Sequence, residues 1–141
     1  MPQELETKIK GVIGWSIAKM MTPCQQMFKI LYDPNSFQTS PTKEQFNKWK
    51  EDFSSCLKIL DLRLVDAPWL CGARMTIGDI IVFNDLSMFM HLCDLDPSHS
   101  EMAEHQNLMK WFKKMQKEPE INKLDTKYLE VLSKSKKTIP Q

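Results

Sequence analysis

The sequence is 141 residues long, which is enough for one domain with a sizeable hydrophobic core. Its net charge of +1 gives no field strong enough to favour binding to nucleic acid or to an acidic membrane surface. Its longest apolar runs, such as residues 80–83, are far too short to span a bilayer, and its acidic N-terminal residues differ from a signal peptide. We therefore expect a soluble, cytoplasmic protein.

Apolar residues recur at helical spacing from about residue 3 to residue 31, which predicts a first long helix. Pro23 lies inside it, so we expect a kink or a second helical segment there. Residues 33–41 are predicted to form a loop, and Thr42 is placed as the N-cap of the next helix. No stretch shows the alternation typical of a strand, and the chain has only four glycines, so the fold class is all-α.

The same periodicity predicts four further helices, which make a bundle of about five: 43–65, 76–92, 107–117 and 119–132. The helix over 76–92 is apolar on nearly every face and should therefore lie at the centre of the domain. An acidic loop over residues 94–105 precedes the fourth helix. We assign residues 1–135 to one helical domain and residues 136–141 to a frayed, lysine-rich tail.

Four cysteines, at positions 24, 56, 71 and 93, form no CxxC pair and have no histidine at zinc-binding spacing. They are predicted to be buried, unpaired thiols in a reducing compartment. The ten methionines fit either core filling or an adaptable apolar pocket.

Other clusters of polar side chains give no metal or nucleic-acid signal. The acidic residues near His91, His99 and His105 match neither an EF-hand nor an HExxH helix, so no metal site is predicted. Lysines 113, 114 and 117 are interpreted as the water-exposed face of the fourth helix.

The most informative stretch is Trp-Leu-Cys-Gly-Ala-Arg-Met-Thr-Ile-Gly-Asp-Ile, at positions 69–80. Thr76 is placed to accept a hydrogen bond from the N3 amide of the helix, while Asp79 reaches back to the N-cap amide, as in a capping box. Met75 and Ile80 are placed as a hydrophobic staple across this box. The pattern favours a structural helix start; the alternative is that Asp79 is a catalytic carboxylate.

This stretch resembles the start of the central helix in glutathione S-transferase C-terminal domains, with Gly78 where alanine is usual. Residues 105–111, His-Gln-Asn-Leu-Met-Lys-Trp, resemble another helix start of the family, with Gln106 replacing the usual proline. The opening Pro-Gln-Glu-Leu, followed by Gly14-Trp15, is similar to the theta class. The resemblance covers roughly residues 2–132 and implies a folding role for the capping box.

Members of that family carry an N-terminal thioredoxin-like domain, which holds glutathione and the residue that activates its thiol. This sequence shows no such strands, so the chain is predicted to contain no catalytic residue and no cofactor of its own. Glutathione would be a co-substrate only where a thioredoxin-like domain is supplied. The resemblance also implies a pocket for the electrophilic co-substrate along the first helix, and core or dimer contact is the alternative for the matching residues: Trp15, Ala18, Lys19, Met21 and Thr22.

Two functions fit these observations. The first is the electrophile-pocket and dimerisation domain of a theta-like glutathione S-transferase, inactive in isolation. The second is a non-catalytic protein–protein interaction module of the same fold, like those in complexes of elongation factors or tRNA synthetases. The implied partner is the missing thioredoxin-like domain, another protein subunit or a second copy. Apolar residues of the first helix and its loop favour association: Phe28, Ile30, Leu31 and Phe37.

Overall fold

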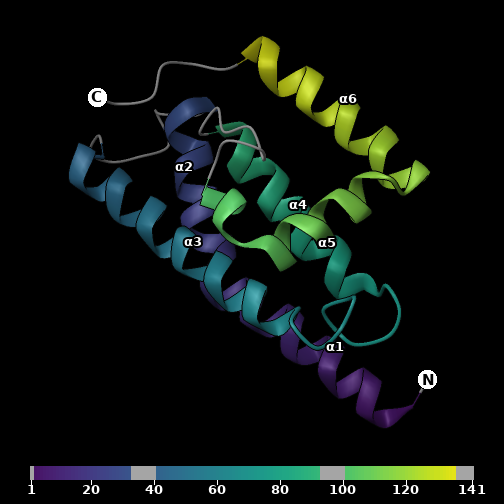
Figure 1. Ribbon diagram of the computed structural model, residues 1–141. Helices are drawn as coiled ribbons and strands as arrows, with labels where there is room; N and C mark the ends of the chain where they lie inside the picture. The colour runs from purple at the N-terminus through teal and green to yellow at the C-terminus, as the bar shows by residue number, and fades with distance from the viewer. Residues whose placement is uncertain (1, 33–40, 93–100, 136–141) are drawn as a thin grey trace.

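The computed structural model describes residues 2–32, 41–92 and 101–135 (Figure 1). Along the chain these residues form α1 (Gln3–Ser16), a π-helical turn η1 (Ile17–Met21), α2 (Thr22–Tyr32), α3 (Lys43–Arg63), α4 (Ile77–Leu92), a 3₁₀ turn η3 (Glu101–Glu104), α5 (Gln106–Gln116) and α6 (Pro119–Ser135). The predicted all-α fold is confirmed over the described residues. None of the described helices is long and apolar enough to cross a membrane.

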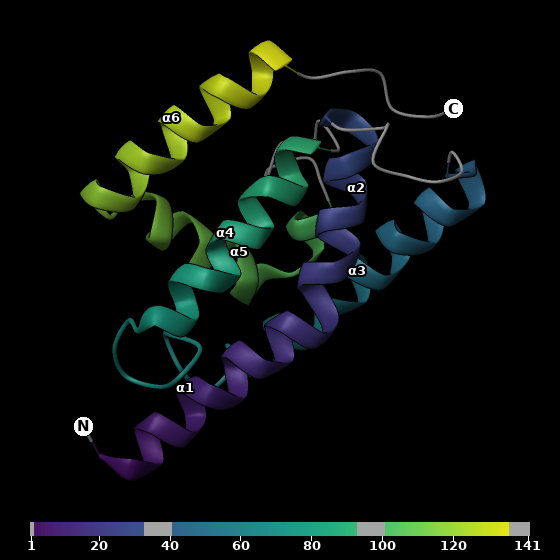
Figure 2. The ribbon, with the colours of Figure 1, turned by 180° about the vertical axis from the view of Figure 1, so that it is seen from behind.

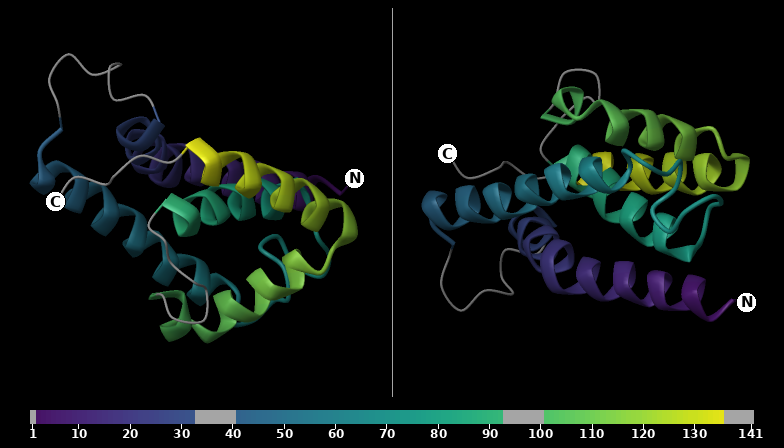
Figure 3. Two further views of the ribbon diagram at one scale, coloured as in Figure 1. Left: turned by 90° about the horizontal axis from the view of Figure 1, so that it is seen from above. Right: turned by 60° about the horizontal axis from the view of Figure 1, so that its bottom comes forward.

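The helices pack as a bundle around α4. Helix α4 contacts α1, α2 and α6, while α3 contacts α2, η1 and α5. Seen from behind, α1 and α2 form one long bent rod that runs past α4 and α3 (Figure 2). Helix α6 lies at the edge of the molecule away from α3 in Figures 1 and 2, and Figure 3 shows the bundle from two further sides.

The middle of α4 forms the centre of the hydrophobic core. Its Phe89 ring stacks on Phe53 of α3, with ring centroids 4.1 Å apart, and its Phe83 ring lies 4.9 Å from that of Phe112 on α5. Burial of each such side chain contributes roughly 1.5–3 kcal/mol to folding. The first turn of α4 is less buried than the predicted central position of this helix implies: Ile77 is 56% exposed and Ile80 is 44% exposed. An apolar sequence does not ensure a covering element, and no described element covers this turn fully.

The predicted long first helix is divided near Pro23 into α1 and α2, as the sequence predicted. The π-helical turn η1 immediately precedes the start of α2, and Pro23 is the second residue of α2. Proline has no N–H to donate to the carbonyl of Lys19, four residues earlier, so a regular α-helix cannot continue through this point. The Cys56 thiol of α3 lies 3.7 Å from that carbonyl oxygen and 3.5 Å from its own helix's Asp52 carbonyl oxygen.

Side-chain acceptors fix the starts of α3 and α5. The Thr42 hydroxyl accepts a hydrogen bond from the Gln45 amide at 3.1 Å, and the Gln45 side chain accepts one from the Thr42 amide at 2.9 Å, which confirms Thr42 as the N-cap of α3. Helix α5 is capped from a distance, because Asp61 of α3 accepts from the Leu108 amide at 2.9 Å. The 3₁₀ turn η3 occupies part of the predicted loop, whose residues 94–100 lie outside the described chain, as do 136–141.

Candidate functional site

The carboxylate of Asp79 joins three segments of the chain at the start of α4. Its side chain is fully buried. Oδ2 accepts a hydrogen bond from the Thr76 amide at 2.9 Å, while Oδ1 accepts from the Leu70 amide at 3.0 Å and from the Trp111 indole Nε1 at 2.8 Å. The same carboxylate therefore holds the helix start, the preceding loop and α5 together.

Two of these partners were not found by sequence reasoning. Leu70 and Trp111 are nine and 32 residues away from Asp79 along the chain, beyond the reach of a local capping motif. The available signal was Trp111 itself: a buried indole N–H needs an acceptor, and the nearby sequence of α5 offers no carboxylate.

The Thr76 cap differs by one position from the predicted box. The Thr76 hydroxyl oxygen accepts from the amide of Gly78, the second residue of the helix, at 3.2 Å. The amide of Asp79, the third residue and the predicted donor, instead donates to the Thr76 carbonyl oxygen at 3.1 Å. Gly78 is closely surrounded: a Cβ built there would lie 3.3 Å from Cys71 Sγ, Thr76 Oγ1 and Val12 Cγ1. The close approach of α1 to α4 therefore leaves little room for the alanine that is usual in the family's pattern.

The two residues predicted as a staple lie in different surroundings. Met75 is half-buried against the hydrophobic core. Ile80, in contrast, lines a surface groove of about 290 Å³ between α4 and α6, together with Phe83 and Leu124.

The residues predicted for an electrophile pocket lie on consecutive turns around the α1–α2 bend. Trp15 is the last but one residue of α1, Ala18, Lys19 and Met21 belong to η1, and Thr22 begins α2. Trp15 and Met21 are half-buried, with Trp15 packed against the core, and the other three are exposed. The structure thus gathers these residues along one stretch of a bent helix, and none of them lines the groove between α4 and α6 or the two cavities beside α5.

A buried polar pair lies directly at this bend. The Ser16 hydroxyl donates to Asp85 Oδ2 at 3.1 Å, and both side chains are buried. Burial raises the pKa of the Asp85 carboxyl to about 6, and the hydrogen bond from Ser16 acts in the opposite direction. The Cys24 thiol of α2 lies 3.7 Å from the Asp85 carbonyl oxygen. Sequence reasoning missed this pair, although an aspartate in the middle of a largely apolar helix was a visible signal.

The chain is similar to known proteins in both sequence and fold. Residues 24–130 match the family described as glutathione S-transferase, C-terminal domain. The chain belongs to this family. The fold is also similar to two solved structures, a glutathione S-transferase-I bound with lactoylglutathione and a mutant of poplar glutathione transferase F1. The first has a TM-score of 0.69 at 11% identity over 89% of this chain, and the second has a TM-score of 0.63 at 12% identity over 86%.

This glutathione S-transferase C-terminal domain spans only part of those structures, 58% of the first and 55% of the second. At such low identity the likeness shows the shared fold alone. A search of curated proteins found no match.

The described cysteines of this glutathione S-transferase C-terminal domain are placed for packing. Cys24, Cys56 and Cys71 are all buried, while Cys93 lies outside the described residues. Burial and the nearby Asp52 carboxylate together raise the pKa of the Cys56 thiol to about 11, against the opposing effect of Lys19. A thiol with this pKa is protonated at neutral pH and is therefore a poor nucleophile.

The histidines named in the sequence offer no site within the described part of the chain. His105 immediately precedes α5 and makes no side-chain cap bond; His99 and the side chain of His91 lie outside the description. In residues 2–32, 41–92 and 101–135, no three His, Cys, Asp or Glu side chains are grouped to hold a metal ion.

Proposed function

We propose that this chain is the C-terminal domain of a cytoplasmic, theta-like glutathione transferase. In that protein it would form one wall of the site for the electrophilic substrate and part of a dimer contact. Conjugation itself would need a thioredoxin-like domain to bind glutathione and activate its thiol. The family match and the likeness to transferases of which this chain spans little more than half support this proposal.

The observation that carries the proposal is the shape of the α1–α2 bend. The π-helical turn widens the helix at η1, and π-bulges are frequent at functional sites. It leaves Ile17 50% exposed between the half-buried side chains of Trp15 and Met21. An exposed apolar surface with one neighbouring cation, Lys19, suits a small apolar electrophile better than a charged one.

A second exposed apolar surface supports the need for a further domain or subunit. Ile77 and Ile80 at the start of α4 and Leu124 of α6 are all exposed, and the last two line the groove between these helices. Adjacent exposed apolar side chains of this kind mark surfaces that another protein part covers. The sequence predicted association from four apolar side chains, at positions 28, 30, 31 and 37, and none of these side chains is among those that the structure describes.

The proposal is tested by fusing this chain to the thioredoxin-like domain of a theta-class glutathione transferase. Ile17→Ser in the fusion should raise KM for an apolar electrophile about threefold to tenfold and leave KM for glutathione unchanged. Ile59→Ser is the matched control, because Ile59 on α3 is 49% exposed, as Ile17 is 50% exposed. Equal effects of the two variants on KM for the electrophile would refute a pocket at the bend.

An interaction module without catalysis is the second candidate. It is favoured by exposed apolar side chains on α3, far along the chain from the bend, where Ile59 and Leu62 lie one turn apart. A fusion that folds but does not accelerate conjugation would support this candidate over the first.

A further inference from the structure

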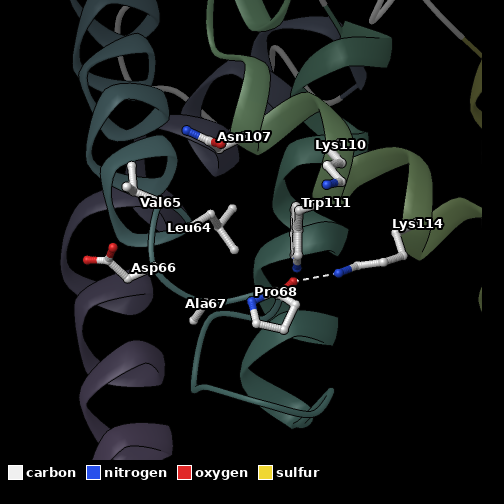
Figure 4. Close-up of a pocket in the computed structure, with 9 residues that line it drawn as sticks. All are labelled: Leu64, Val65, Asp66, Ala67, Pro68, Asn107, Lys110, Trp111 and Lys114. Atoms are coloured by element: carbon white, nitrogen blue, oxygen red, sulfur yellow. Dashed lines mark hydrogen bonds between the residues drawn. The ribbon is translucent and has the colours of Figure 1, made fainter.

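A groove of about 370 Å³ lies between α5 and the chain that follows α3 (Figure 4). Helix α5 supplies Asn107, Lys110 and Lys114 along one wall, and the opposite side includes Val65 and Pro68. Val65 is 57% exposed, so the groove presents apolar surface to solvent beside two ammonium groups.

The lysines of this wall belong to a continuous basic face. Helix α5 contains Lys110, Lys113 and Lys114 and no acidic residue. A neighbouring cavity on the other side of Lys110 is lined by Lys113 and Gln106. The ion pairs within the described chain lie on α1 and α3, and none involves these three lysines. The basic face is therefore available to a negatively charged partner.

Lys114 is held in place by the groove itself. The sequence predicted it as part of a water-exposed face, but it is half-buried: its ammonium donates to the Pro68 carbonyl oxygen at 2.7 Å and lies 4.0 Å from the centre of the Trp69 ring. Burial and the charge of Lys110 lower the pKa of Lys114, while Asp79 raises it. Lys114 thus braces the groove, and the exposed Lys110 is the cation that can meet a ligand.

We propose that this groove binds an acidic, leucine-containing segment of a partner protein. Carboxylates of the segment meet Lys110 and Lys113, and one apolar side chain packs on Val65 and Pro68. Charge complementarity of this kind sets both orientation and association rate. The proposal is independent of any role in glutathione conjugation, because the groove lies on α5 and not at the α1–α2 bend.

The groove favours a peptide over a nucleic acid. Single-stranded nucleic acids bind by stacking bases on exposed aromatic rings. Trp111 in this groove is only 1% exposed, and Lys114 covers a face of the nearby Trp69 ring. Asp66, which also lines the groove, can accept from a peptide N–H, a donor that a phosphodiester backbone lacks.

The test uses the full chain labelled with ¹⁵N and a capped peptide of repeated Asp-Leu-Glu units. Amide shifts should change at residues 64–68 and 106–114 and should saturate as peptide is added. Lys110→Glu should weaken binding about tenfold, because it replaces attraction by repulsion. Lys127→Glu on α6 is the matched control, since it makes the same charge change at an exposed residue of another helix, and it should change affinity less than about twofold.

Two further comparisons test the apolar contact and the fold. Replacing leucine by serine in the peptide should weaken binding to the native chain, and Val65→Ser should remove that preference for leucine. Lys110→Gln removes the charge without reversing it and should lose less affinity than Lys110→Glu. It tests the role of Lys110 even where Lys110→Glu does not fold. The proposal is overturned if millimolar peptide shifts no amide in these segments, if Lys110→Glu and Lys127→Glu lose affinity equally, or if a poly-uridine oligonucleotide binds the same face more tightly than the peptide does.

Discussion

Replacing Asp79 by alanine should destabilise the protein more than the loss of a helix cap alone. The change leaves the Thr76 amide, the Leu70 amide and the Trp111 indole N–H without their acceptor. The last two hydrogen bonds are buried, and each buried donor left unpaired costs about 1–3 kcal/mol. The cap adds about 1 kcal/mol, and removal of a buried carboxylate offsets part of the total. We expect a loss of about 3–5 kcal/mol.

The experiment is urea unfolding of the native chain, three single variants and one double variant. With a slope of about 1–3 kcal/mol/M, Asp79→Ala should lower the midpoint by about 2 M. Asp79→Asn keeps Oδ1 as an acceptor but places an NH₂ group against the Thr76 amide, so it should cost less than Asp79→Ala. Thr76→Ala removes the acceptor for the Gly78 amide and should cost roughly 0.5–2 kcal/mol.

The double variant sharpens the test. Asp79→Ala combined with Thr76→Ala should lose less stability than the sum of the single variants, because both side chains belong to one network at the helix start. An unchanged urea midpoint for Asp79→Ala would refute the reasoning, since it would mean that the carboxylate does not support the fold.

The remaining predictions concern titration, thiol reactivity and association. Burial raises the pKa of the Asp85 carboxyl from 3.8 to about 6, so the folded chain holds this proton more tightly than the unfolded chain does. The stability that the bound proton contributes is complete below about pH 4 and is lost as pH rises through about 6. Between pH 4 and pH 7.5, the free energy of unfolding of Asp85→Asn should therefore rise by about 2–3 kcal/mol relative to that of the native chain. A difference in urea melts that does not change with pH would contradict this. Cys56 should resist a thiol reagent at neutral pH until the chain unfolds, and rapid labelling of its peptide in mass spectrometry would show an accessible thiolate. The chain should self-associate weakly through exposed apolar side chains such as Leu62; sedimentation of a strict monomer at high concentration, without binding of a hydrophobic dye, would count against this.

Local sequence patterns predicted the helices and their starts. Apolar periodicity located the helices to within a few residues, because each must bury one face. Thr42 and the Thr76–Asp79 pair were recognisable because a cap acts within three residues. Pro23 predicted the break in the first helix because a missing N–H has a local consequence.

Contacts between distant segments could not be predicted in this way. The hydrogen bond of Asp79 with Trp111 joins residues 32 apart, and that of Ser16 with Asp85 joins residues 69 apart. Exposure of Ile80 also escaped prediction, because an apolar sequence does not reveal which of its faces a neighbouring element will cover. Lys114 was predicted to face water, since no sequence pattern connects it with the Pro68 carbonyl group.

The most direct test of the proposed function compares three proteins in one assay of glutathione conjugation to chlorodinitrobenzene: this chain, a theta-class thioredoxin-like domain, and their fusion. We predict that only the fusion raises the initial rate above the uncatalysed reaction, because glutathione activation and the electrophile wall would lie on different domains. Robust turnover by this chain alone, or a cooperatively folded fusion no faster than the uncatalysed reaction, would contradict the account.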